Sequence, residues 1–304
     1  MSDYVVRVQT KDGFARAFCG IFTETVDEAR RVHGLGAQAA DLLGRALMGA
    51  SMMGLMLKHE DDLLTVRLSG DGPLGGVLAT SGADGLPKGY VFNPDADIPT
   101  GEGGRTSGLA AFGQGELTVI KDLGLKEPYQ GRIQLVSGEV AEDLAMYFTQ
   151  SEQTPTAVAL GVSFNDNGVK AAGGFIIQLM PGAPDPLAAY IQNCVVSLPS
   201  ISSMIAESKT PEDILNEAFG GFETEALARH EIRYRCDCCR ERVESALLSV
   251  NIRELRKMRD EDGRAEICCH FCKENYLFSK DDLSGLINER IEAFAKGLKE
   301  IGGS

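Results

Sequence analysis

The cysteines of this chain are concentrated near its C-terminal end. Six of the eight lie in two short groups, Cys236-Asp237-Cys238-Cys239 and Cys268-Cys269-His270-Phe271-Cys272. Each group can offer two thiolates, and the groups are separated by about thirty residues, a spacing that can close a tetrahedral four-sulfur site. Zinc is the usual metal in such a site. The sequence therefore predicts a zinc-binding module.

Spacing alone leaves the choice of ligands open. The candidates in the first group are Cys236 with either Cys238 or Cys239, and those in the second are Cys269 with Cys272, besides Cys268 and His270. The C-x-x-C loop is the usual zinc knuckle, so spacing favours that loop in both groups.

Zinc motifs of this kind most often only stabilise a small domain. Two features favour a chemical role in addition. The groups contain surplus thiols, and cationic residues flank them: Arg233, Arg235, Arg240, Arg242 and Lys273. Positive charge favours the thiolate, which is the form that oxidants attack.

The cysteine pattern also resembles that of a known family. Cys236-Asp237-Cys238 followed by Cys269-His270-Phe271-Cys272 is similar to the C-x-C and C-x-x-C zinc motif of the redox-regulated heat-shock holdases, the 33 kDa chaperonin family. Three upstream stretches support the resemblance: YQG at 129–131, YFTQSEQTP at 147–155 and AAGGFIIQL at 171–179. The order and spacing match over nearly the whole chain.

This resemblance implies a specific set of site residues. The ligands of one Zn²⁺ in the reduced state would be Cys236, Cys238, Cys269 and Cys272. Oxidation would form the disulfides Cys236–Cys238 and Cys269–Cys272 and release the metal. Cys239 and Cys268 depart from the family pattern as additional thiols, which leaves mixed disulfides or alternative ligation open.

The resemblance further implies an ATP-independent molecular chaperone rather than an enzyme. Its partners would be unfolded or partly unfolded client proteins, bound after a linker unfolds. The protein would be a monomer when reduced and a homodimer when oxidised. No catalytic residue is expected, because the four histidines show no nucleophile–base spacing.

Two other functions are compatible with the cysteines. Cys269 and Cys272 could form the active site of a thiol-disulfide oxidoreductase, although no thioredoxin-like βαβ pattern surrounds them. A constitutive zinc-ribbon interaction module would hold the same metal without redox chemistry. An oxidoreductase would reduce insulin disulfides in a standard assay. A constitutive zinc-ribbon module would keep its zinc after treatment with peroxide.

Composition narrows the class of protein. The 304 residues are 43% hydrophobic and 24% charged, which is ordinary for a soluble protein with a core. The net charge of −14 argues against a nucleic-acid partner. The N-terminus lacks a secretory pattern, and the most apolar stretch, 42–57, is interrupted by Arg45 and too short to span a bilayer. We therefore expect a protein without a membrane segment. Because its cysteines are grouped as metal ligands, which requires reduced thiols, we expect it in the cytoplasm.

Hydrophobic periodicity predicts an α+β fold in three parts. The first, residues 1–180, is a mixed α/β core domain with an antiparallel sheet, and the resemblance assigns it client binding and dimerisation. Expected strands are 4–10, 14–23, 63–69, 76–80, 89–92, 116–121, 131–136, 157–164 and 168–179, and expected helices are 24–33, 37–58 and 139–150. Met48, Met52 and Met56 recur along the second helix, either as core residues or as an adaptable client surface.

The other two parts follow a boundary near residue 180. Residues 181–230 are helical in pattern and form a metastable linker, because short helices depend on packing for their stability. Residues 231–304 form the C-terminal zinc-binding redox-switch domain, with helices at 240–249, 252–260 and from 279 to about 299. A module this small has little core of its own, so zinc must supply much of its folding free energy.

Overall fold

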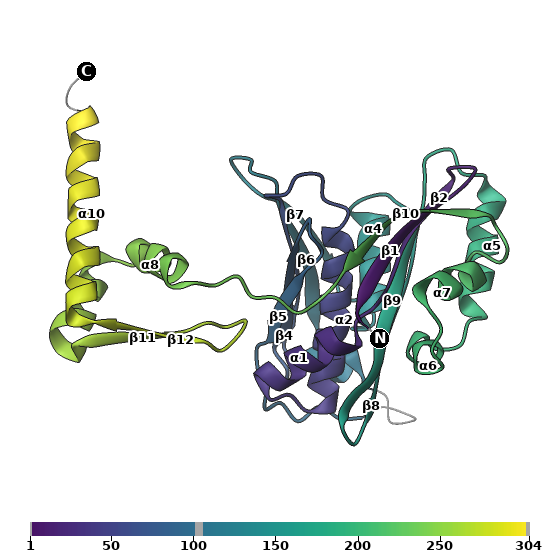
Figure 1. Ribbon diagram of the computed structural model, residues 1–304, viewed down its shortest axis with the longest axis horizontal. Coiled ribbons are helices and arrows are strands. Elements are labelled where there is room, and N and C mark those ends of the chain that lie inside the picture. Colours follow the sequence, from purple (N-terminus) through teal and green to yellow (C-terminus); the bar gives the residue numbers. More distant parts are fainter. Residues whose placement is uncertain (1, 101–105, 302–304) are drawn as a thin grey trace. The chain divides into compact units, whose positions relative to one another are not determined.

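The computed structural model describes residues 2–100 and 106–301, with side-chain burial given up to residue 292. It divides into two compact units, Met1–Arg235 and Cys236–Ser304, which are described separately (Figure 1). The first unit contains two five-stranded sheets, and every strand pair in them is antiparallel. The predicted α+β class is confirmed.

The first sheet, here called sheet A, has the order β10-β1-β2-β9-β8. Its strands are β1 (Tyr4–Thr10), β2 (Ala15–Ile21), β8 (Thr156–Asn165), β9 (Gly168–Leu179) and β10 (Thr224–Glu231). The second, sheet B, has the order β5-β4-β3-β6-β7. Its strands are β3 (Leu63–Gly70), β4 (Gly76–Gly82), β5 (Pro87–Val91), β6 (Gly115–Asp122) and β7 (Tyr129–Gln134).

Four helices belong to the same part of the chain: α1 (Thr23–His33), α2 (Ala37–Gly54), α3 (Gly108–Phe112) and α4 (Val140–Gln150). Helix α2 packs against strands of both sheets, and 15 of its 18 residues are buried. Glycines allow this close packing, because a Cβ at Gly49 would lie 2.6 Å from Leu144 Cδ1. Met48 and Met52 are buried here, and Met56, which lies past the end of α2, is partly buried against the same core, so these methionines are core residues rather than a client surface.

The central strands of sheet A are buried on both faces, which explains their nearly continuous hydrophobic sequence. One face contributes to the main core around α1 and α2. The other forms a second core with three helices: α5 (Asp185–Val196), α6 (Ile201–Ala206) and α7 (Pro211–Ala218). A capping box between Thr210 and Asp213 starts α7.

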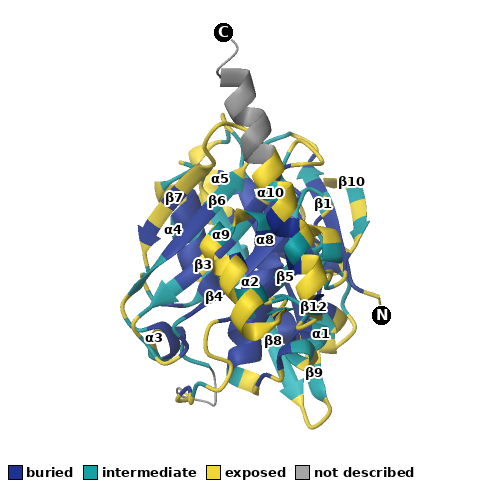
Figure 2. Ribbon diagram, turned by 90° about the vertical axis from the view of Figure 1, so that its left-hand side faces the viewer, coloured by how far each residue is buried: buried dark blue, intermediate teal, exposed yellow. Residues whose placement is uncertain are grey.

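The prediction that residues 181–230 are helical is wrong at its C-terminal end. Residues Thr224–Glu231 form β10, which pairs with β1 in register from Thr10↔Thr224 to Tyr4↔Glu231. This strand lies at the edge of sheet A and is mostly exposed, as its yellow and teal colours show in Figure 2. Because neither face is fully buried, β10 carries no clear hydrophobic alternation that could identify it.

The second unit is small. It contains α8 (Arg240–Ser249), α9 (Ile252–Lys257), a π-helical turn η2 (Met258–Asp262), the hairpin of β11 (Arg264–Cys268) and β12 (Asn275–Ser279), and α10 (Lys280–Ile301). Helix α8 is confirmed, whereas the predicted helix 252–260 is α-helical only to Lys257. Up to residue 292, where burial is described, seven buried side chains form its core: Leu247, Leu255, Ala265, Phe278, Leu283, Leu286 and Ile287. No helix in the described parts of the chain is long and apolar enough to cross a membrane.

Candidate metal centre

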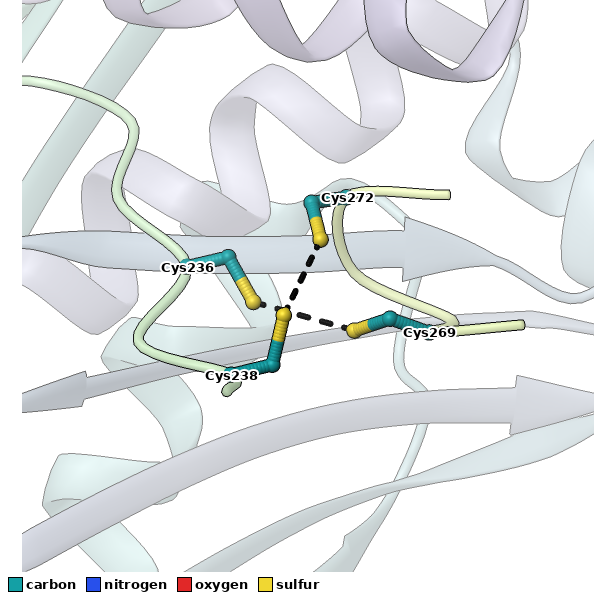
Figure 3. A group of neighbouring side chains, drawn as sticks. All are labelled: Cys236, Cys238, Cys269 and Cys272. Carbon is teal, nitrogen blue, oxygen red and sulfur yellow. Dashed lines mark hydrogen bonds between the residues drawn. The ribbon is translucent and has the colours of Figure 1, made fainter. Parts of the chain in front are cut away.

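Four sulfur atoms converge in the second unit. The Sγ atoms of Cys236, Cys238, Cys269 and Cys272 all lie within 4.8 Å of one another. Two contacts link the two cysteine groups, at 3.2 Å for Cys238–Cys272 and 3.7 Å for Cys236–Cys269 (Figure 3). The structure therefore brings together the four cysteines that the family resemblance implies.

Local backbone structure positions each pair. Cys269 and Cys272 lie in the tight turn between β11 and β12, where the Cys269 amide donates to the Glu274 carbonyl at 2.8 Å. Lys273 closes this turn in the left-handed region, with φ of 62°. Cys236 and Cys238 lie in the segment before α8, whose N-cap residue is Cys239.

The four donors fit a metal ion. A tetrahedral site with Zn–S bonds of about 2.3 Å separates its sulfurs by about 3.8 Å, close to the distances found here. All eight cysteines are free thiols. The Tyr276 hydroxyl donates to Cys238 Sγ at 3.2 Å, as the groups that orient metal ligands commonly do. This cluster could hold one metal ion.

Comparison with known proteins agrees with this geometry. A family model described as "Hsp33 protein" matches residues 3–279. The chain belongs to the Hsp33 family. The 33 kDa chaperonin of Clostridioides difficile is 45% identical over 290 residues, covering 95% of this chain and 100% of that protein. The 33 kDa chaperonin of Desulforamulus reducens is 46% identical over 293 residues, covering 96% and 99%.

A solved structure supports the same conclusion. The crystal structure of the 33 kDa chaperonin (heat shock protein 33 homolog) from Thermotoga maritima matches with a TM-score of 0.87 and 37% sequence identity, covering 96% of this chain and 100% of that one. The predicted family resemblance is confirmed, and the fold of this Hsp33 family member follows that of a solved relative.

The electrostatics of the cluster are those of thiols that share protons. Burial raises the pKa of Cys236 to about 11 and also raises the pKa of Cys272. Burial acts on Cys238 too, but hydrogen bonds from Tyr276 and Cys272 outweigh it and lower the pKa of Cys238. In the 3.2 Å pair the pKa of Cys238 therefore lies below that of Cys272, so Cys238 is the more acidic of the two thiols. A bound cation would replace such protons and favour the thiolate at every ligand.

The surplus thiols of this Hsp33 chain lie outside the group of four. Cys239 and Cys268 are exposed, whereas the four clustered cysteines are partly buried. Spacing alone favoured Cys239, but that residue starts α8, and Cys238 instead reaches the other sulfurs. The other two cysteines lie in the first unit, where Cys19 is buried in sheet A and Cys194 is partly buried on α5.

Proposed function

We propose that this protein is an ATP-independent holdase chaperone that oxidation activates. In the reduced monomer, Cys236, Cys238, Cys269 and Cys272 bind one Zn²⁺, and the linker, residues 181–230, is folded. Oxidation unfolds the zinc-binding redox-switch domain, residues 231–304, and then the linker. The core domain, residues 1–180, dimerises and binds unfolded or partly unfolded clients, which prevents their aggregation.

The packing of the linker carries this proposal. Helices α5 to α7 cover one face of sheet A, and the residues they bury there are apolar: Leu187, Ile191, Ile201, Met204, Ile214, Leu215, Ala218 and Phe219. Beneath them lie apolar side chains of the sheet, among them Val6, Ile21 and Phe175. If the helices leave, both sets become exposed, and a contiguous apolar surface is what binds unfolded chains.

The linker helices are also easily released. They contain 12, 6 and 8 residues, lengths that are marginal in water without tertiary packing. The last linker element, β10, is an exposed edge strand that ends at Glu231, shortly before Cys236 in the chain. A loss of structure at the first cysteine group would therefore begin next to the least buried part of the linker.

The second unit depends on its metal. Among the residues whose burial is described, up to 292, its core has seven buried side chains, and the cysteines that a metal would link between the two groups lie 31 or more residues apart in the sequence. Structural zinc sites contribute about 10–16 kcal/mol to folding, whereas a whole domain is stable by only about 5–15 kcal/mol. Loss of the ligands is therefore enough to unfold this unit.

The redox step balances with peroxide as the oxidant. Two thiolates of one cysteine group lose two electrons and form a disulfide, while peroxide accepts these electrons, its O–O bond breaks, and two hydroxide ions form. We assign the disulfides to Cys236–Cys238 and Cys269–Cys272. Neither disulfide offers a thiolate, so the metal is released. Cys239 and Cys268 stay outside this exchange.

The expected setting is the cytoplasm, where thiols stay reduced until oxidative stress. The net charge of −14 disfavours nucleic acid as a partner. We expect no enzymatic turnover, because the proposed role of each clustered cysteine is to hold or release the metal.

The test combines zinc content, free thiols and chaperone activity in one sample, before and after peroxide with mild heat. We expect zinc to be lost, about four thiols to disappear, and thermal aggregation of a client to be suppressed only after oxidation. Zinc that stays bound with thiols intact would instead indicate a constitutive zinc-ribbon module. Turnover in an insulin-reduction assay would indicate a thiol-disulfide oxidoreductase.

A further inference from the structure

Strand β8 is an unprotected sheet edge. It is the outer strand of sheet A opposite β10, and its ten residues, TAVALGVSFN, include neither a charged residue nor proline. The other outer strands of the two five-stranded sheets do contain such residues: Pro87 and Lys88 in β5, Arg132 in β7, and Glu225 and Arg229 in β10. Proteins use charge and proline to prevent edge pairing, so β8 is the edge that remains able to accept another strand.

The backbone of β8 has unused hydrogen-bonding capacity. Within the described residues its only strand partner is β9, from Thr156↔Gln178 to Asn165↔Gly168. In an antiparallel pair, alternate residues direct their N–H and C=O groups away from the partner. From Thr156 to Ser163, where the pairing with β9 is regular, every second residue of β8 therefore presents both groups outward, ready for an added antiparallel or parallel strand; a shift of register follows between Ser163 and Phe164.

A groove runs along this edge. A cavity of about 930 Å³ is lined by the seven consecutive residues 158–164, together with residues of α2, α4 and the connection between α5 and α6. Because consecutive residues point to opposite faces of a strand, contact with all seven means that the groove reaches both sides of this edge; it also extends to Phe175 on the neighbouring strand β9. Seven residues span about 23 Å, which suits a short extended segment.

The two walls of the groove differ in character. The linker wall is largely apolar, with Leu198, Pro199 and Ile201. The opposite wall, from α2, α4 and the N-cap residue of α4, carries three carboxylates, Asp41, Glu139 and Glu142, and one cation, Arg45.

The acidic wall retains a net negative charge. Arg45 forms ion pairs with Asp41 at 2.8 Å and Glu139 at 3.0 Å, so its positive charge is already balanced by these two carboxylates. Glu142 is exposed and has no ion-pair partner in the described part of the chain. The wall is therefore complementary to a lysine or arginine side chain.

We propose that an extended client segment bearing lysine or arginine adds as a strand to β8 and lies in this groove. The proposal rests on the proposed chaperone function and names one place where the client is held. Backbone hydrogen bonds to β8 are independent of client sequence, which suits a chaperone with many clients, while Glu142 favours basic segments. When the linker leaves, the apolar face of sheet A next to this edge is uncovered, and the edge and face together hold the client.

The first test uses a labelled peptide, Val-Lys-Val-Thr-Val-Lys-Val, whose binding to the full-length protein is measured by fluorescence anisotropy. Two derivatives carry N-methyl groups on alternate residues, in opposite phases. In strand addition only one phase removes the donors that face β8, so we expect at least tenfold weaker binding for one derivative and less than threefold for the other. Equal binding of both derivatives would overturn the proposal.

The second test reverses the charge of the groove. Glu142→Lys should weaken binding of the lysine peptide about tenfold and strengthen binding of the analogue with glutamate in place of lysine. The matched control is Glu127→Lys, an exposed position between β6 and β7 that gives the same change in net charge. If both variants change binding equally, long-range charge rather than the groove is responsible, and the proposal fails.

Both tests are made on reduced and oxidised protein. The β8 edge and the acidic wall lie outside the linker, so the phase dependence and the effect of Glu142→Lys should be found in both states, whereas the wall of Leu198, Pro199 and Ile201 is lost on oxidation. Aggregation suppression is measured separately. If the protein suppresses aggregation but binds both N-methylated peptides equally, the proposed groove is wrong while the chaperone function stands. If the two peptides bind differently but the protein suppresses aggregation in neither state, the proposed chaperone function is wrong.

Discussion

The hydroxyl group of Tyr4 on β1 donates a 2.8 Å hydrogen bond to Oε2 of Glu212 on α7. The guanidinium carbon of Arg229, on β10, lies 3.6 Å from the centre of the Tyr4 ring. One side chain of the core thus contacts both the last helix and the final strand of the linker. Hydrogen bonds to charged groups contribute about 1.5–3 kcal/mol, so this contact matters for a marginal linker.

Tyr4→Phe should loosen the linker while keeping the ring and its packing. We expect the backbone amides of α7 to exchange hydrogen about tenfold faster, because the lost hydrogen bond is comparable to one tenfold step in the local opening equilibrium. Client binding should require milder oxidation or a lower temperature, and zinc content should not change. Hydrogen exchange followed by mass spectrometry measures the effect.

The matched control is Tyr129→Phe, which removes the same hydroxyl from an exposed tyrosine on β7. It should leave exchange in α7 unchanged. Equal exchange in wild type and Tyr4→Phe would show that the Tyr4–Glu212 contact does not hold the linker.

Substitution of two adjacent cysteines, Cys268 and Cys269, should affect zinc affinity very differently. Cys269→Ser removes one of the four clustered sulfurs and should lower zinc affinity at least a hundredfold, with loss of structure in α8 and the β11–β12 hairpin. Cys268→Ser changes an exposed thiol outside the cluster and should leave zinc affinity within about threefold of wild type. Competition with a chromogenic chelator measures both. Full zinc retention by Cys269→Ser would refute the ligand assignment.

Much of the fold could be predicted because its signals are local. The turn at Asp12-Gly13, the capping box at Thr210 and the two cysteine groups are each set by neighbouring residues. Strand β10 could not be predicted, because what makes it a strand is its pairing with β1, about two hundred residues earlier in the chain. Local sequence carries little trace of such a partner.

In the cysteine cluster, too, local sequence does not decide which of two neighbouring sulfur atoms joins the site. Cys238 and Cys239 are neighbours of the same type, and spacing rules favour the latter. Which sulfur reaches Cys272 depends on where α8 begins, because the residue at the helix start points its side chain elsewhere. The family resemblance supplied this choice where residue chemistry could not.

Asp3 should make stability depend on pH in an unusual direction. Its carboxylate accepts hydrogen bonds from the amides of Glu24 and Thr25, but burial dominates and raises its pKa from 3.8 to about 6. A raised pKa means that the stabilisation is complete below about pH 3.8 and is lost as pH rises through about 6. The full change corresponds to about 3 kcal/mol.

Asp3→Asn removes this titration. The difference in unfolding free energy, variant minus wild type, should therefore increase by up to about 3 kcal/mol between pH 4 and pH 7, as measured by urea unfolding at each pH. Asp12→Asn is the control, because the pKa of that exposed carboxyl is lowered by its hydrogen bond with Thr10. For Asp12→Asn, the difference in unfolding free energy from wild type should stay constant between pH 4 and pH 7. A constant difference for Asp3→Asn would refute the burial argument.

Cys19 offers a direct measure of linker release. It lies on β2 with no exposed surface, in the second core that α5 to α7 cover, and burial raises the pKa of its thiol. A thiol that is both inaccessible and protonated does not react with iodoacetamide. In the reduced, zinc-loaded protein we therefore expect Cys19 to stay unmodified for hours. After oxidation it should be alkylated within minutes, because the helices that cover it have left.

Peptide mass spectrometry measures alkylation separately at each cysteine, so Cys19 can be followed by itself and Cys194 can serve as the internal control. Cys194 is partly buried on α5, so it should react slowly before oxidation and faster afterwards, ahead of Cys19 in both states. The order matters, because Cys194 reports movement of one linker helix whereas Cys19 reports exposure of the sheet itself. If oxidised protein suppresses aggregation while Cys19 remains protected, clients bind elsewhere, and uncovering of sheet A is not the basis of activity.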